Sequence, residues 1–92
     1  MLPAVTLKVA STASGRATIA WGKAAGATGY QVYYSTNASS GYKKIANYTT
    51  NSTYQYNLKS GTTYYYRARA YKAVDGAYVY GAWSPVVSVK IK

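Results

Sequence analysis

Residues 58–72 decide the fold of this chain, and they read Leu58-Lys59-Ser60-Gly61-Thr62-Thr63-Tyr64-Tyr65-Tyr66-Arg67-Ala68-Arg69-Ala70-Tyr71-Lys72. In a β-strand successive side chains point to opposite faces, so alternate residues share one environment. From Thr62 to Lys72 one face collects Tyr64, Tyr66, Ala68 and Ala70, and the other collects Tyr65, Arg67, Arg69 and Tyr71. Because the arginines lie in the second set, we predict a long strand that buries the first face and turns the second to solvent.

Shorter alternating runs on both sides of this strand predict further strands. They cover Val5–Val9, Ala17–Trp21, Tyr30–Tyr34, Tyr42–Ala46, Thr53–Leu58 and Val86–Ile91, the last with Val87, Val89 and Ile91 inward. Tyr54, Tyr56 and Leu58 share parity, which places them on one face, although the register of this fifth strand stays open. Seven short strands between turn signals predict an all-β, seven-stranded immunoglobulin-like two-sheet sandwich, with residues 1–92 as a single domain.

The composition argues against catalysis. The chain has 92 residues, no His, no Cys and one acidic residue, Asp75. General acid–base catalysis normally needs His or paired carboxylates, and metal sites need clusters of His, Cys, Asp or Glu. A lysine nucleophile would need a desolvated pocket with helper groups, which this composition hardly offers. We therefore predict a binding or structural module that is not an enzyme and uses no metal or cofactor.

Eleven Lys and Arg residues against one acidic residue give a net charge of +10. A field of this sign attracts polyanions. The basic residues are nevertheless scattered from Lys8 to Lys92, and only Lys43 and Lys44 are adjacent, so we favour a solubilising surface over a dedicated polyanion site. No apolar run is long enough to span a bilayer, so membrane insertion is not expected.

Three residues carry a resemblance to a known family. Trp21 in the second predicted strand, together with Leu58 and Tyr64 around the start of the sixth, resembles the pattern of a fibronectin type III domain. The resemblance implies that Leu58 closes the core at a strand corner and that the Tyr64 hydroxyl bonds back to nearby backbone as a tyrosine corner. The most similar variety is the one repeated in bacterial cell-surface and secreted proteins, which matches at residues 26–30, 41–45 and 79–81. Two departures are Ser60, where the family often has proline, and a fifth strand one residue short before Leu58.

The resemblance also implies that strands three, six and seven share a sheet. The solvent face of that sheet then collects six candidate binding residues, namely Tyr33, Tyr65, Arg67, Arg69, Tyr71 and Lys90. Tyrosine rings stack on sugars or guanidinium groups, and arginine offers forked donors to phosphate or carboxylate, so this surface suits an anionic polymer or a glycan. The alternative, which we favour, is that these residues form ordinary cross-strand pairs that stabilise the sheet. Trp83 is expected either to cover the edge of the core or to stack on neighbouring side chains.

A second candidate surface is the loop Val74–Ala82, where Tyr78 and Tyr80 flank a tight hairpin turn at Asp75-Gly76. This loop is expected to lie beside the Gly-rich loop Lys23–Gly29. Loops rich in Tyr, Ser and Gly are also typical of selected binding proteins, so an engineered loop-based binding scaffold is an alternative that we rank low. Nucleic-acid binding is disfavoured, because no recognised motif supports it and the basic residues trace no single groove.

Fold alone does not define function, because sandwiches of this kind serve as spacers, adhesins and scaffolds. We predict a non-catalytic structural, adhesion or spacer module of a larger extracellular or cell-surface protein, monomeric as an isolated domain. Its expected partners are neighbouring domains of the same chain. The alternative is a binding module for a cell-wall polymer, a glycan or a protein.

Overall fold

The computed structural model describes residues 4–92. These residues form eight strands and no helix, so none of them belongs to a helix that could cross a membrane. The strands are β1 (Leu7–Ala13), β2 (Arg16–Trp21), β3 (Gly29–Ser35), β4 (Lys43–Tyr48), β5 (Ser52–Gln55), β6 (Thr63–Val74), β7 (Ala77–Tyr80) and β8 (Val87–Lys90). The first strand runs well beyond the predicted end at Val9, because its pairing with β2 resumes after an irregularity between Ala10 and Ala13.

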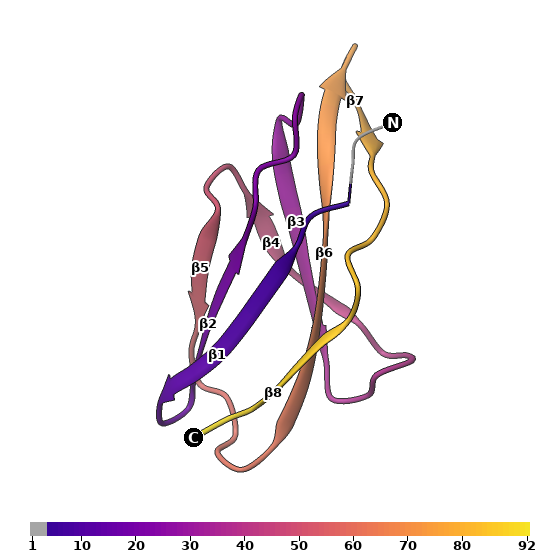
Figure 1. Ribbon diagram of the computed structural model, residues 1–92. Helices are drawn as coiled ribbons and strands as arrows, with labels where there is room; N and C mark the ends of the chain where they lie inside the picture. Colours follow the sequence, from indigo (N-terminus) through magenta and orange to yellow (C-terminus); the bar gives the residue numbers. More distant parts are fainter. Residues whose placement is uncertain (1–3) are drawn as a thin grey trace.

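The strands form two antiparallel sheets, which make the two layers of the sandwich (Figure 1). One sheet has the order β1-β2-β5, and the other has the order β4-β3-β6-β7, with β8 also paired to β6. The predicted all-β two-sheet sandwich is therefore confirmed. The edge beside β6 is one interrupted strand, since β7 pairs with the second half of β6 and β8 with the first half. Between them Pro85 has no N–H with which to continue the pairing.

The predicted inward face of β6 is buried as a whole, and the Tyr66 side chain is fully enclosed. Trp21 lies in the core as expected, with its ring centroid 5.9 Å from that of Tyr30 and 5.6 Å from that of Tyr48. Burying one large apolar side chain stabilises the fold by roughly 1.5–3 kcal/mol. The core cluster comprises Val5, Leu7, Ala17, Ile19, Trp21, Ala24, Tyr30, Val32, Tyr64, Tyr66, Ala68, Ala70 and Ile91, with Val87 and Val89 partly buried against it.

The chain has no phenylalanine, and several core positions are tyrosines, so each buried hydroxyl needs a hydrogen-bond partner. The Tyr64 hydroxyl accepts a hydrogen bond from the backbone N–H of Lys59 at 3.1 Å, which is the predicted tyrosine corner. The Tyr66 hydroxyl donates to Gln55 Oε1 at 2.6 Å and thereby links the two sheets. Burial, together with the neighbouring tyrosines, raises the pKa of Tyr66 above the usual value for a phenol.

The fifth strand ends early and then reverses the side-chain alternation. β5 stops at Gln55, and Asn57 has a φ of 61°, a left-handed conformation that breaks the strand. Tyr54 and Tyr56 consequently point outward and are 53% and 60% exposed, whereas Leu58 packs against the core. The prediction that these three side chains share a face is therefore wrong for Leu58.

The predicted hairpin turn at Asp75-Gly76 is confirmed, since the two residues have φ values of 50° and 79°. Two central residues with positive φ match the twist of the flanking strands, so pairing resumes at once. Val74 pairs with Ala77, and the segment predicted as a loop, Val74–Ala82, instead contains β7. That prediction is wrong because the turn takes only two residues and the rest of the segment completes the ladder.

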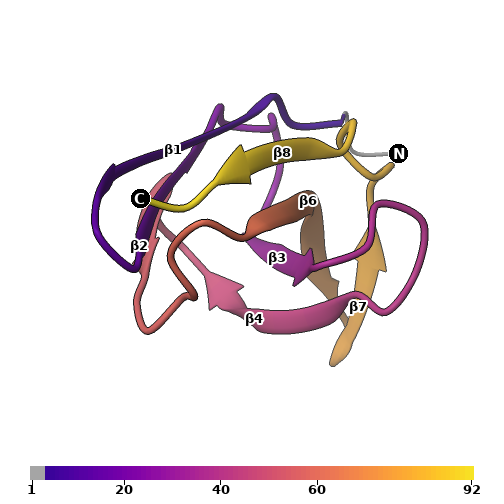
Figure 2. The same cartoon turned by 90° about the horizontal axis from the view of Figure 1, so that it is seen from below.

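The last two residues are fixed at one end of the sandwich. The Lys92 backbone oxygen accepts hydrogen bonds from Gly15 N–H and from the Ser60 hydroxyl, both at 2.8 Å, and Lys92 N–H donates to the Ser11 hydroxyl at 3.0 Å. Gly61 N–H donates to the Ile91 carbonyl at 2.7 Å. In the view from below, β8 runs beside β1 before it reaches this end (Figure 2). The final strand thus closes one side of the sandwich and ties its own terminus to two turns.

Candidate functional site

The outer face of β6 carries an alternating stack of cations and rings. Alternation turns Arg67 and Arg69 outward, about 7 Å apart along the strand, which leaves room for one aromatic ring between their guanidinium groups. Trp83 fills that space, with its ring 4.1 Å from the guanidinium carbon of Arg67 and 4.4 Å from that of Arg69. A cation over an aromatic face is attracted by the ring quadrupole.

The stack continues on both sides. The Arg67 guanidinium also lies 4.4 Å from the ring of Tyr42, next to β4, and the Arg69 guanidinium lies 3.7 Å from the ring of Tyr80 on β7. Each arginine is therefore held between two rings. We call this set the cation–π ladder, and its members in order are Tyr42, Arg67, Trp83, Arg69 and Tyr80.

Two hydrogen bonds between Ser84 and the backbone of Ala68 position the neighbouring Trp83 in the ladder. Ser84, the next residue, is buried, and its hydroxyl accepts a hydrogen bond from Ala68 N–H at 2.9 Å. Its own N–H donates to the Ala68 carbonyl at 2.8 Å. Ala68 is the residue between the two arginines, so clamping Ser84 there sets Trp83 directly between them. The interruption between β7 and β8 thus brings Trp83 into the space between the two arginines.

The arginine head groups are mostly occupied by this framework. Arg69 Nε donates to Gln31 Oε1 at 3.0 Å, and Gln31 is itself buried. Arg67 Nε is buried and has no hydrogen-bond partner among residues 4–92. The rings pack against the guanidinium groups of both arginines, so the N–H edges of these groups are the part left for a ligand.

The structure brings together some of the predicted binding residues but not all. Tyr33 joins the ladder edge-on, with its ring centroid 5.1 Å from that of Trp83 and the planes 89° apart. Tyr65 and Lys90 lie on the same face, paired with Ser88 and Thr63, yet within the described residues neither contacts the ladder through a ring or a cation.

Tyr71 was expected in solvent and is instead 5% exposed, so that prediction is wrong. Tyr78 covers its ring at a centroid distance of 4.5 Å, and Tyr80 meets Tyr78 edge-on. On the other side Tyr71 lies over Gly29, its partner on β3, where an added Cβ would stand 2.5 Å from the Tyr71 hydroxyl oxygen. Burial and the two neighbouring tyrosines raise the pKa of Tyr71.

Tyr42, Gln31 and Ser84 belong to the site and were not predicted as part of it. Trp83 and Ser84 lie in a segment without strand periodicity, so side-chain alternation could not place them. Tyr42 was the first residue of a predicted strand, but it lies just outside β4. A chemical signal for the site was present in the sequence. Two arginines at alternate positions of one strand need aromatic or anionic partners, and Trp83 was an aromatic residue whose role the sequence left open.

The fold and the site define the class of protein: an immunoglobulin-like sandwich with a tyrosine corner. Among residues 4–92 no cluster of three or more His, Cys, Asp or Glu residues could hold a metal ion. A Fn3-like protein from Clostridium thermocellum is 26% identical with a TM-score of 0.81, over 100% of this chain and 93% of that one. The sixth fibronectin type III domain of human fibronectin type III domain containing protein 3 is 19% identical with a TM-score of 0.83, over 99% and 86% of the two chains. No protein-family model matches this sequence, and neither does any curated protein.

The chain has the fibronectin type III fold, as its resemblance implied, and the likeness to a clostridial protein is in keeping with the bacterial variety. Domains of this fold are typically structural or spacer modules in larger proteins. A β-1,2-glucanase from Parabacteroides distasonis also contains a similar region, at 23% identity and a TM-score of 0.77, but this region is only 13% of that chain.

Proposed function

We propose that this chain is a non-catalytic spacer module of a larger extracellular or cell-surface protein, monomeric when isolated. The observation that carries the proposal is the placement of the chain ends on an elongated body. The sandwich measures 43 × 24 × 20 Å, and the described chain starts in the upper half of Figure 1 and ends at the bottom. Modules joined through such ends extend along the long axis.

The hydrogen bonds around Lys92 support a defined direction for the joint. The terminus is held to the turn at Gly15 and to Ser60 rather than hanging from β8. A segment attached after Lys92 would therefore leave from a rigid end, and a short rigid joint transmits length better than a flexible one.

The chemistry of the chain also favours support over catalysis. The sequence has no His or Cys, and its one acidic residue, Asp75, lies in the exposed β6–β7 turn. The arginines of the cation–π ladder are packed between rings, which fits stabilisation of the sheet better than a vacant binding surface.

A length measurement tests the proposal. Proteins with one, two and three directly joined copies are compared by small-angle X-ray scattering. The maximum dimension should grow with each copy by clearly more than the 24 Å short axis but by less than 43 Å, because the β6–β7 hairpin extends beyond the point where the described chain starts (Figure 1). A control with a long Gly/Ser linker between copies should give a broader distribution of lengths. Growth close to the 24 Å or 20 Å short axes would mean that the copies fold back side by side, and the spacer proposal would fail.

A second candidate function is adhesion to an anionic polymer. Eleven basic residues stand against one acidic residue, so most of the positive field of the chain is not cancelled internally. Exposed guanidinium edges and lysines could then hold a polyanion through contacts that weaken as salt rises. Retention on immobilised heparin that falls steeply with salt would support this function, and no retention at low salt would reject it.

A further inference from the structure

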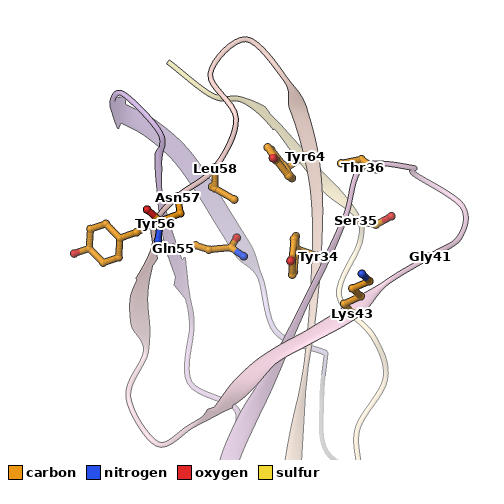
Figure 3. Close-up of a pocket in the computed structure, with 10 residues that line it drawn as sticks. All are labelled: Tyr34, Ser35, Thr36, Gly41, Lys43, Gln55, Tyr56, Asn57, Leu58 and Tyr64. Carbon is orange, nitrogen blue, oxygen red and sulfur yellow. The ribbon is translucent and has the colours of Figure 1, made fainter.

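The early end of β5 leaves one side of the sandwich open. β5 stops at Gln55, and the left-handed Asn57 carries the chain away before Leu58 returns to the core. A pocket of about 490 Å³ opens there, between this segment and the ends of β3 and β4 (Figure 3). Its volume is typical of small-molecule sites, which span about 300–1,000 Å³. The spacer role does not require this pocket.

The walls combine aromatic, amide and hydroxyl groups. Gln55 and Leu58 point in from one side, and Tyr34 and Tyr64 face them from the other (Figure 3). The two tyrosine rings lie 6.3 Å apart. Because Gln55 Oε1 already accepts from the Tyr66 hydroxyl, the free function of the Gln55 amide is its NH₂ group, a pair of donors held in a fixed direction.

The charge of the pocket has one sign. Lys43 is the single charged side chain that lines it, and no carboxylate does. The one acidic residue, Asp75, follows the far end of β6, about 35 Å along the strand from Tyr64. An anionic group in the pocket therefore meets an ammonium group and no local repulsion, and charge-assisted hydrogen bonds are the stronger ones.

We propose that this pocket binds a saccharide unit that carries a carboxylate. The sugar ring packs its C–H face on the tyrosine wall, the Gln55 NH₂ group and the Tyr34 hydroxyl bond its hydroxyls, and Lys43 takes the carboxylate. A neutral sugar lacks the last contact, and a simple carboxylate lacks the stacking. This site is separate from the cation–π ladder, and it depends on neither the spacer proposal nor polymer adhesion by the ladder face.

Lys44 provides a matched control, because it neighbours Lys43 on β4 but does not line the pocket. Lys43→Met and Lys44→Met remove the same charge, so any difference between them in ligand binding reports on contacts inside the pocket rather than on the net charge. The probes are D-glucuronate, D-glucose and acetate, added to the isotope-labelled chain and followed by amide proton–nitrogen NMR spectra. Glucuronate should shift amides around Tyr34, Gln55 and Leu58 in the wild type and in Lys44→Met.

Lys43→Met should weaken glucuronate binding about tenfold, which is what one charge-assisted hydrogen bond is worth. D-Glucose and acetate should each bind the wild type no more tightly than D-glucuronate binds the Lys43→Met variant. Tyr34→Phe, which keeps the ring and its packing, should weaken binding several-fold while the rest of the spectrum stays unchanged. Equal loss in the two lysine variants would mean that only the general field attracts the sugar. That result, or the absence of localised shifts, would overturn the proposal.

Discussion

Replacing Trp83 by leucine tests whether the cation–π ladder stabilises the sandwich. The change removes two cation–π contacts, to Arg67 and Arg69, and one edge-on contact to Tyr33. Each cation–π contact is worth about 1 kcal/mol at a partly desolvated site, and the aromatic pair adds about 1 kcal/mol. Leucine keeps part of the apolar packing, so the free energy of unfolding should fall by about 3 kcal/mol. For a small domain this is a large share of a total of roughly 5–15 kcal/mol.

Urea denaturation followed by far-ultraviolet circular dichroism measures this loss without adding salt. Tyr56→Leu serves as the control, since Tyr56 is 60% exposed and its aromatic pairing among the described residues is with Tyr54 alone, outside the cation–π ladder. It should change stability by less than about 1 kcal/mol. A double-mutant cycle between Trp83→Leu and Arg67→Met isolates their contact and should give a coupling of about 1 kcal/mol.

Two results would refute this reasoning. If Trp83→Leu costs no more than Tyr56→Leu, the ladder contributes nothing to folding. If the single variants are destabilised but the coupling is zero, Trp83 stabilises by apolar burial alone and its place between the arginines is incidental. In either case the guanidinium groups would again become candidates for a ligand surface.

Three further substitutions probe other parts of the fold. Gly29→Ala should destabilise by about 1–3 kcal/mol, because the added Cβ would overpack against the Tyr71 ring and would stand 2.7 Å from the backbone oxygen of Tyr48. Gly22→Ala, with open space around it, should not destabilise the fold, and equal effects of the two variants on thermal unfolding would contradict the packing argument. Burial raises the pKa of Tyr66 in the folded state, so this phenol ionises first in the unfolded state and stability should fall as pH rises above about 10. Tyr66→Phe should flatten this decline in denaturation curves recorded from neutral to alkaline pH. An unchanged slope would mean that other groups cause the decline. Ser84→Ala leaves a buried backbone N–H without its partner and should cost about 1–3 kcal/mol in urea denaturation, a cost that an unchanged midpoint would exclude.

Alternation alone was sufficient to predict the framework. The two faces of β6, the inward residues of β8 and the turn at Asp75-Gly76 all follow from local rules, because side-chain parity and positive φ depend only on a few neighbouring residues. The tyrosine corner came from the family resemblance. These elements fix which sheet face carries Arg67 and Arg69.

The details of the site could not be predicted in the same way. Tyr71 has outward parity but is buried, because a glycine opposite it and a ring from β7 enclose it across the sheet. Trp83 is placed by Ser84, whose partner Ala68 is distant in sequence. Leu58 faces inward because a single left-handed residue, Asn57, resets the alternation. Each case depends on tertiary contacts or on one backbone angle that no periodic pattern records.

Because Asp75 is the one carboxylate side chain, the stability of this domain should depend little on acidic pH. Acid denaturation proceeds mainly by protonating carboxylates that the native state holds in ion pairs or hydrogen bonds. Here Asp75 is the one acidic residue of the sequence, so acidification adds at most a single positive unit to side chains that already carry +10. The sandwich should therefore unfold at nearly the same urea concentration in acidic buffer as at neutral pH. Its stability should fall instead in alkali, where Tyr66 and Tyr71, whose pKa values burial raises, ionise more readily in the unfolded chain.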